Sequence, residues 1–252
     1  MRKRIRKARS YAIYYGYDRV EQLWQYDAVV LHPGAHSKEN LESLSELHTV
    51  ALAYLSMGED ANTSQTKTQP WWKANPEGQL QQNLEFGGII VDPAHPNWQA
   101  QILENARKSL DMGFQGLFLD TLDSSDEADQ LALAKLIVKL RATFPNIALV
   151  LNRGFRVLSR VAPIVDGALF EGLSTTWQMQ ETGKPKYLPL SQPMKVANQE
   201  VAVSMVTWAE RYGFACWALD YEDSPDLKAF AQREAKRLGF VSFTSNWQLL
   251  RI

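Results

Sequence analysis

Short runs of Val, Ile, Leu, Tyr and Phe recur along the chain, and within each run polar and apolar positions do not alternate strictly. This pattern is typical of parallel strands that are covered by other elements on both faces. The runs predict eight strands, at residues 12–15, 28–31, 49–55, 116–120, 147–152, 167–171, 214–220 and 240–244.

Longer segments with apolar residues three or four positions apart lie between these runs and predict helices. The predicted helices span residues 19–25, 38–48, 97–112, 125–140, 156–161, 198–211 and 226–238. In the third of them, Asn97 is a suitable N-cap and Gly113 marks the end, and Ser125 is a suitable cap for the fourth.

Eight strands with interleaved helices in a chain of 252 residues predict an α/β fold, a single (β/α)8 TIM barrel. A doubly wound open sheet is the alternative, but such a sheet more often carries a glycine-rich phosphate-binding turn after its first strand. Residues 14–18, Tyr-Tyr-Gly-Tyr-Asp, are no such turn. Long loops follow the third and sixth strands, at residues 56–96 and 172–197, the first with a short extra strand expected at 89–91. Both belong at the C-terminal face of a barrel, where active sites lie.

The basic residues are distributed unevenly. Residues 2–7 hold five Arg and Lys side chains, and the rest of the chain has 22 basic and 28 acidic residues, a net charge of −6. Nucleic-acid binding needs a basic surface, so nucleic acid is not an expected partner. We expect residues 1–10 to form a solvated basic tail and residues 11–252 to form the barrel domain. Because residues 8–18 lack the apolar stretch of an export signal, the sequence taken alone predicts a cytoplasmic protein.

Composition excludes several classes of protein and site. Hydrophobic residues make up 45% of the chain and charged residues 22%, which excludes a disordered chain. No run approaches the roughly 18 apolar residues of a membrane span. The single cysteine, Cys216, excludes an intrachain disulfide and a cysteine-based zinc site. His32 and His95, with Asp120 or Asp220, are a candidate metal site, but the HxH and HExxH spacings are missing, as is the GxSxG motif of serine hydrolases.

Three predicted strands end in an acidic residue: Asp120, Glu171 and Asp220. Each carboxylate is either a structural group, as a helix cap or a partner of Arg153, or a group that points into the mouth of the barrel. Because strand ends meet at one mouth, three acids there favour the second interpretation. Paired carboxylates are the groups that cleave glycosidic bonds. Asp123 either lines this cleft or caps the helix that follows it.

Tryptophans provide a second signal, because sugar rings pack their C–H faces on flat aromatic side chains. The chain has eight tryptophans, and Trp71, Trp72 and Trp177 lie in the two long loops. Packing in the core is the alternative for each tryptophan. It is favoured for Trp98 on a helix face and for Trp217 within a strand.

The segments that carry a family resemblance are residues 14–16 (YYG), 53–59 (AYLSMGE), 113–123 (GFQGLFLDTLD), 152–155 (NRGF), 170–173 (FEGL) and 219–221 (LDY). In consistent order they resemble glycoside hydrolase family 114, the endo-α-1,4-polygalactosaminidase-like proteins. The resemblance runs from Tyr11 to the C-terminus, and residues 113–123 are its most distinctive part.

This resemblance implies a (β/α)8 barrel that acts, without metal or organic cofactor, on α-1,4-linked galactosamine-containing polysaccharide, and it allows for export. It implies Asp120 as the nucleophile and Glu171 as the acid/base. The expected substrate-binding residues, which include two loop tryptophans, are Tyr15, Glu59, Trp72, Asp92, Asp123, Asn152, Trp177, Asp220 and Tyr221. The alternatives are a non-catalytic carbohydrate-binding barrel, which needs neither carboxylate in reactive geometry, and a metal-dependent hydrolase, which a chelator would inactivate.

The strand positions also predict the stereochemistry of cleavage. Asp120 and Glu171 end the fourth and sixth strands, so their Cα atoms should stand about two strand spacings, roughly 10 Å, apart. Side chains that converge across the mouth shorten this separation by several ångström. Retaining glycosidases hold their carboxyl groups about 5–5.5 Å apart and inverting ones about 6.5–9.5 Å, so we expect retention.

Overall fold

Parallel strands form one eight-stranded sheet in the computed structural model, which describes residues 1–61, 67–124 and 126–252. In their order around the barrel the strands are β1 (Tyr11–Tyr14), β2 (Ala28–Leu31), β3 (Val50–Ser56), β6 (Gly116–Asp120), β7 (Ala148–Asn152), β8 (Gly167–Glu171), β11 (Ala215–Tyr221) and β12 (Val241–Ser245). Each boundary lies within one residue of its predicted position. Parallel pairings join consecutive members of this order.

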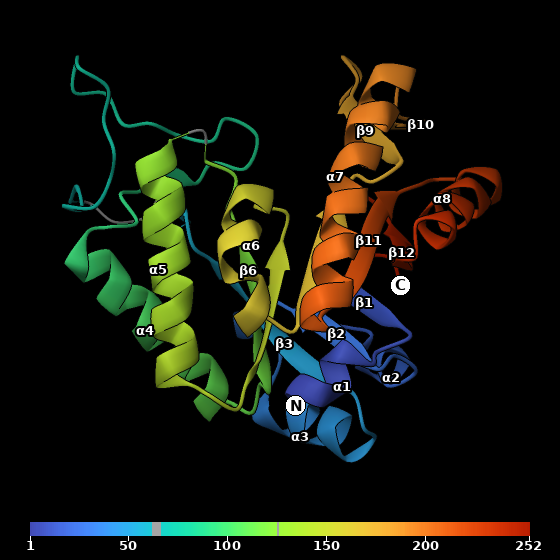
Figure 1. Cartoon of the computed structure of the whole chain (residues 1–252), viewed down its shortest axis with the longest axis horizontal. Helices are drawn as coiled ribbons and strands as arrows, with labels where there is room; N and C mark the ends of the chain where they lie inside the picture. The colour runs from blue at the N-terminus through green and yellow to red at the C-terminus, as the bar shows by residue number, and fades with distance from the viewer. Residues whose placement is uncertain (62–66, 125) are drawn as a thin grey trace.

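The two outer strands, β1 and β12, lie next to each other, so the sheet curls into a nearly closed barrel (Figure 1). The rings of Tyr11 and Phe243 lie 5.7 Å apart where these strands meet, and the N–H of Tyr15 donates to the carbonyl oxygen of Leu249 at 2.9 Å. The prediction of a (β/α)8 barrel is therefore confirmed. The doubly wound alternative is wrong, because such a sheet leaves its outer strands apart.

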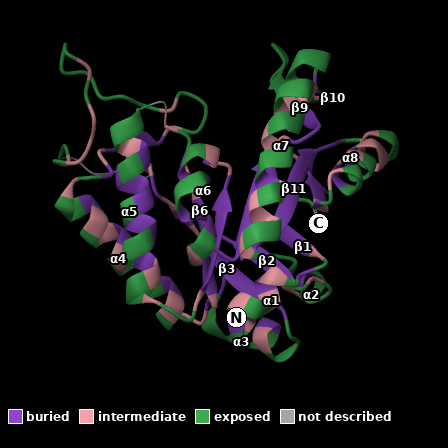
Figure 2. Cartoon of the chain, viewed as in Figure 1, coloured by how far each residue is buried: buried purple, intermediate pink, exposed green. Residues whose placement is uncertain are grey.

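Helices cover the outside of the barrel, with their exposed faces toward solvent (Figure 2). They are α2 (Val20–Leu23), α3 (Lys38–Glu46), α4 (Pro96–Asp111), α5 (Glu127–Thr143), α6 (Phe155–Val161), α7 (Gln192–Tyr212) and α8 (Pro225–Arg237), with 3-10 turns η1 (Pro33–Ala35) and η2 (Ala162–Ile164). In α5, Leu133, Ile137 and Leu140 are buried, as their spacing predicts. Within the described ranges, none of the helices is both long and apolar enough to cross a membrane.

The N-caps of α4 and α5 are His95 and Asp126. The N-cap of α4 is His95 and not Asn97, because a proline occupies the first helical position, where no N–H donor is needed, and Nδ1 of His95 accepts from the N–H of Asn97 at 3.2 Å. Gly113 follows the end of α4 with φ 114°, a conformation that glycine tolerates. Ser125, the predicted cap of α5, lies outside the described residues; Asp126 caps this helix by accepting from two backbone N–H groups.

The expectation of a solvated tail at residues 1–10 is wrong for its central part. Helix α1 (Arg2–Arg6) packs against the N-terminal ends of β7 and β8, with Ile5 fully buried. Asp166, which is also fully buried, accepts from Nε of Arg2 and of Arg6 at 3.0 Å and pairs with Arg141 at 2.7 Å. The buried carboxylate explains why these two arginines pack against the barrel and do not extend into solvent.

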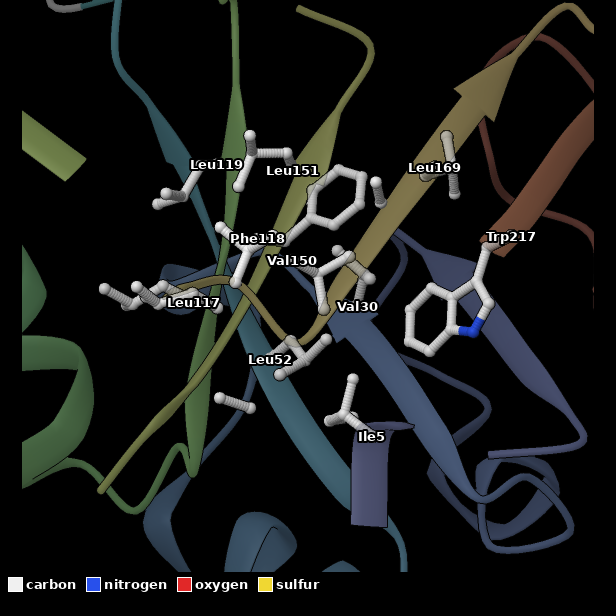
Figure 3. Packing of buried hydrophobic residues seen from close by; sticks show 14 of the residues in the cluster. Ile5, Val30, Leu52, Leu117, Phe118, Leu119, Val150, Leu151, Leu169 and Trp217 are labelled. Atoms are coloured by element: carbon white, nitrogen blue, oxygen red, sulfur yellow. The ribbon is translucent and has the colours of Figure 1, made fainter. Parts of the chain in front are cut away.

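Apolar side chains fill the barrel interior (Figure 3). The ring of Trp217 in β11 stacks on Tyr11 of β1, with centroids 4.3 Å apart and an interplanar angle of 7°. A side chain at Gly167 would contact both Val150 and Ile5, so α1 packs closely against the bottom of the barrel. The packed N-terminal end leaves the C-terminal ends of the strands as the open face.

The connection after β3 carries a small antiparallel pair, β4 (Glu59–Asp60) and β5 (Ile89–Ile90). The second strand lies within the expected 89–91. Bridges from Trp72 to Val91 and from Gln82 to Ile89 continue this pairing. The segment therefore folds back over the C-terminal face beside α5 (Figure 1).

The connection after β8 is not the open loop expected at residues 172–197. It contains an antiparallel hairpin of β9 (Thr175–Met179) and β10 (Pro185–Pro189), and α7 begins soon after it. The turn closes with a hydrogen bond from the N–H of Gln180 to the carbonyl oxygen of Lys184 at 3.0 Å and has Gly183 at φ 72°. In Figure 1 this hairpin stands beside the upper end of α7.

Candidate active site

A cavity of about 960 Å³ opens at the C-terminal ends of the barrel strands. The side chains predicted for the site that line this cavity are Tyr15, Glu59, Asp120, Asp123, Asn152, Glu171 and Tyr221. They come from segments that are far apart in the sequence and meet only because parallel strands end at one face.

One amide group joins the two predicted catalytic acids. Asp120, Asn152 and Glu171 are the last residues of the neighbouring strands β6, β7 and β8. Nδ2 of Asn152 donates to Oδ1 of Asp120 at 2.8 Å and to Oε2 of Glu171 at 2.7 Å. Two oxygens that lie this close to one nitrogen are at most about 5.5 Å apart. The bridge therefore holds the two carboxyl groups at a short separation.

The environment of Asp120 raises the pKa of its carboxyl group from 3.8 to about 6. Burial is the main cause, because loss of water disfavours the charged form, and the charge of Glu171 adds to it. Hydrogen bonds from the N–H of Thr121, from Asn152 and from the Tyr54 hydroxyl oppose the rise. Asp120 is consequently ionised above about pH 6.

Glu171 is held through both its side chain and its backbone. The Tyr221 hydroxyl donates to Oε1 of Glu171. Burial and the charge of Glu171 raise the pKa of Tyr221 well above its ordinary range, so this hydroxyl keeps its proton. Nη1 of Arg153 donates to the carbonyl oxygen of Glu171 at 2.8 Å, and its guanidinium lies over the ring of Phe155 at 5.5 Å. These contacts fix the carboxyl group toward Asn152.

Aromatic side chains form the wall of the cavity next to Asp120. The ring of Tyr15 lies 5.5 Å from Tyr54 and 6.5 Å from His32, and both contacts are edge-on. The rings of His32 and Tyr54 are stacked at 6.1 Å. Burial, above all, raises the pKa of Tyr15 well above its ordinary range. Both tyrosine hydroxyls are therefore neutral groups near the carboxylate.

Two further acids of the prediction line the cavity with partners of their own. Oε1 of Glu59 accepts from Nδ2 of Asn83 at 3.0 Å. Asp123 forms an ion pair with Nε of Arg153 at 2.8 Å and accepts from the N–H of Gly154 at 3.1 Å. Of the two interpretations of Asp123, the cleft-lining one matches the structure, since Asp126 caps α5.

Asp220 lies outside the cavity, in contrast to the expectation that it binds substrate. It is fully buried, and its carboxylate accepts from the N–H and the hydroxyl of Ser174 and of Thr175. Burial raises its pKa to about 6 against these hydrogen bonds. Because the strand alternates, Asp220 points out of the barrel and anchors the start of β9.

Trp72, Asp92 and Trp177 also do not line the cavity. Nε1 of Trp72 donates to Oδ2 of Asp60 at 2.8 Å, and Asp92 accepts from a backbone N–H in its own turn at 2.8 Å. The ring of Trp177 packs on Trp247 at 5.1 Å. Each of these side chains therefore has a structural partner.

Other cavity-lining residues were missed by the sequence analysis. Tyr54 lies two positions before the end of β3, and Trp247 lies two positions after the end of β12. Both residues lie near strand ends, so the rule that parallel strands end at one face could have identified them. Phe86, which is 65% exposed, lies in the long connection after β3, where no periodicity marks its position.

The two histidines of the predicted metal site have different structural roles. His32 packs in the aromatic wall, and His95 caps α4. In the part of the chain that the structure describes, no group of three or more His, Cys, Asp or Glu side chains is arranged to hold a metal ion.

Comparison with known protein families gives a match over most of the chain. The sequence model of glycoside-hydrolase family GH114 matches residues 4–246. An uncharacterized protein of Methanocaldococcus jannaschii is 31% identical over 91 residues, which are 36% of this chain and 26% of that protein. The match therefore spans about a quarter of the length of this curated relative.

Solved structures share the fold. The glycoside hydrolase domain of PelA from Pseudomonas aeruginosa is 26% identical with a TM-score of 0.81, and 97% of each chain is covered. Aspergillus fumigatus Ega3 in complex with galactosamine is 13% identical with a TM-score of 0.66, over 96% of this chain and 91% of that one. At such low identity the likeness to Ega3 shows the fold alone.

Proposed function

We propose that this chain, which belongs to glycoside-hydrolase family GH114, is a glycoside hydrolase that cleaves α-1,4-linked polysaccharide containing galactosamine. We propose further that cleavage retains the configuration at the anomeric carbon. Asp120 is the nucleophile and Glu171 the acid/base. The observation that carries the proposal is the Asn152 bridge, which keeps the two carboxyl oxygens within about 5.5 Å. Retaining glycosidases use a separation of about 5–5.5 Å.

In the first step, the carboxylate of Asp120 attacks the anomeric carbon while Glu171 gives its proton to the glycosidic oxygen. The bond from the anomeric carbon to that oxygen breaks, and a covalent glycosyl ester on Asp120 forms. In the second step, Glu171 takes a proton from water, and the water oxygen displaces Asp120 from the same carbon. Two inversions give net retention, and both carboxyl groups return to their starting forms.

The chain's own residues prepare each partner for this sequence. The hydrogen bonds that Asp120 accepts from Asn152 and Tyr54 favour its ionised form, which is the form that attacks. The Tyr221 hydroxyl keeps one oxygen of Glu171 engaged, so that the oxygen near Asn152 faces the bridge. The acid and the nucleophile thus approach the bond from separate strands.

Acidic side chains support an amino sugar as the substrate. Glu59, Asp123, Asp126 and Asp129 line the same cavity as the catalytic pair. Lys73 pairs with Asp129 at 2.6 Å, and Arg153 pairs with Asp123, so the remaining acids give this side of the cavity a negative potential. An unacetylated galactosamine carries an ammonium group that such a surface attracts.

The test is digestion of a polymer panel followed by mass spectrometry of the products. The panel contains α-1,4-linked galactosamine polymer, its N-acetylated form, β-1,4-linked glucosamine polymer and polygalacturonate. We expect oligosaccharides only from the α-linked galactosamine polymers. Asp120→Asn and Glu171→Gln should each remove nearly all of this activity, and Asp111→Asn, at the end of α4, serves as the control. Cleavage of only the other polymers would overturn the proposed substrate, and binding without cleavage would favour a non-catalytic barrel.

A further inference from the structure

The three bridged side chains share a backbone feature. Each stands at the end of its strand, and the next residue is in each case left-handed: Thr121 at φ 58°, Arg153 at φ 49° and Gly172 at φ 66°. Glycine adopts this conformation without strain, but for a β-branched residue it is an outlier that the surroundings must hold in place. Thr121, which directly follows Asp120, is such a residue.

The hydroxyl group of Thr121 supplies the contacts that hold it. Oγ1 accepts from the N–H of Met57 at 3.0 Å and from the N–H of Gly58 at 2.7 Å, and it lies 3.0 Å from Oγ of Ser56. It also lies 2.7 Å from the carbonyl oxygen of Asp120, to which it donates its hydrogen. One hydroxyl therefore connects the end of β6 to the chain that leaves β3.

The chain on the β3 side is itself fixed. The N–H of Met57 also reaches the carbonyl oxygen of Asp120 at 3.0 Å, and the Met57 carbonyl oxygen accepts from Nε1 of the buried Trp98 at 2.9 Å. A Cβ at Gly58 would lie 2.3 Å from the carbonyl oxygen of Thr121, so only glycine permits this approach. The hydroxyl of Thr121 is thus anchored to rigid backbone.

We propose that Thr121 is a positioning residue for the nucleophile: its hydroxyl holds the left-handed turn that aims the Asp120 carboxylate into the cavity. This proposal rests on the function proposed above, in which Asp120 attacks the sugar. The N–H of Thr121 belongs to the same turn, and its interaction with the Asp120 carboxylate lowers the pKa of that carboxyl group. Without the hydroxyl the strained residue relaxes, and both the direction of the carboxylate and this interaction change.

The first test compares two substitutions of one residue. Thr121→Val keeps the branched shape and removes the hydroxyl, and we expect kcat/KM to fall about 100-fold, as for a misplaced reacting group. Thr121→Ser keeps the hydroxyl and should retain most of the rate. Thr143→Val is the matched control, because the exposed Thr143 hydroxyl also donates to a backbone carbonyl oxygen, at 2.8 Å. Full activity in Thr121→Val, or equal losses in the Val and Ser variants, would overturn the proposal.

The second test does not depend on activity. The carboxyl carbon of Asp120 is titrated by NMR in the wild-type chain and in Thr121→Val, and the midpoint should move to higher pH in the variant because a hydrogen bond to the ionised form is lost. An unchanged midpoint would overturn the proposal. If Thr121→Val does not fold, Thr121→Ala replaces it, since alanine also lacks the hydroxyl and is also strained in a left-handed turn; its midpoint should rise in the same way. A wild-type chain that cleaves no polymer contradicts the proposed function. The titration still decides whether Thr121 positions the Asp120 carboxylate, because it does not depend on activity.

Discussion

At the scale of single residues, the site depends on one amide nitrogen. Nδ2 of Asn152 has two hydrogens, and each is donated to a different carboxylate. Two carboxylates this close repel each other, and the shared donor compensates for part of that repulsion. The pKa of Asp120 is nevertheless raised to about 6, mainly by burial and further by the charge of Glu171.

The raised pKa of Asp120 predicts the acid limb of the pH–rate profile. The nucleophile must be ionised, so kcat/KM should fall tenfold per pH unit below about pH 6. An ordinary aspartate would place this limb near pH 4. The measurement is kcat/KM on a soluble oligosaccharide from pH 4 to pH 9. A limb near pH 4 would mean that the carboxylate is well solvated in the working enzyme. The midpoint belongs to the coupled pair of acids.

The same shift predicts how stability depends on pH. Asp120 binds its proton more tightly in the folded chain, with a pKa of about 6 against an ordinary 3.8, so it costs stability as pH rises from about 4 to about 6. Asp120→Asn removes that cost and should stabilise the fold at pH 8 by about 1–3 kcal/mol. For a domain of this size the melting temperature should rise by about 2–8 °C. The gain should disappear at pH 4; an equal gain at both pH values would contradict the ionisation account.

At the scale of elements, α1 and the β9–β10 hairpin have different structural roles at opposite ends of the barrel. Helix α1 brings Arg2 and Arg6 to the buried carboxylate of Asp166, beside the starts of β7 and β8. The hairpin lies at the other end, where the N–H of Trp247 donates to the Tyr187 hydroxyl at 3.2 Å. The first element therefore contributes stability and the second shapes the cavity.

Asp166→Asn tests the contribution of α1. The substitution leaves three arginines around a buried position without their counter-charge, so the free energy of unfolding should fall by about 3–5 kcal/mol. Urea unfolding measures this loss, with the exposed Asp111→Asn as the control. The kcat of the folded variant should stay near that of the wild type, because Asp166 lies at the far end of the barrel. A loss below about 1 kcal/mol would mean that α1 does not depend on this carboxylate.

Trp247→Ala tests the part of the cavity wall that the hairpin supports. Trp247 lines the cavity and is backed by Trp177, whereas Trp72 is bound to Asp60 away from it. If a sugar ring stacks on Trp247, its loss should raise KM for the polymer about tenfold, the equivalent of about 1.4 kcal/mol. KM for a small activated substrate should change less. Trp72→Ala is the matched comparison. It should change KM for the polymer and KM for the small substrate by similar factors relative to the wild type. Equal losses on both substrates in Trp247→Ala would place this indole at the reacting sugar.

At the scale of the whole molecule, the sequence pattern was sufficient for the barrel and for the strand ends that carry the candidate catalytic residues. Buried parallel strands are continuous apolar runs, and an acid or amide at the end of such a run is visible without coordinates, as at Asp120, Asn152 and Glu171. Whether a strand side chain points into the barrel or out of it depends on its position in the alternation along the strand. Asp220 therefore looked equivalent to Glu171, although the outward register of Asp220 buries it under β9.

Other features depend on contacts between distant segments and have no local pattern. Residues 1–10, which contain Arg2 and Arg6, looked like a solvated tail because the partner of these two arginines, Asp166, is 160 or more positions away. Phe86 reaches the cavity only because the connection after β3 folds back over the barrel. Composition and periodicity describe neighbours along the chain, so these placements had to come from the structure.

The central claim is that Asp120 and Glu171 act as a retaining pair across the end of β7. Proton NMR of the first product measures this most directly, because the new reducing end appears as one anomer before mutarotation mixes the two. With an α-1,4-linked galactosamine polymer as substrate, retention gives the α anomer first, and its appearance together with loss of all cleavage in Asp120→Asn is the result we predict. The β anomer as the first product would show inversion, which needs about 6.5–9.5 Å between the carboxyl groups, and would contradict the account.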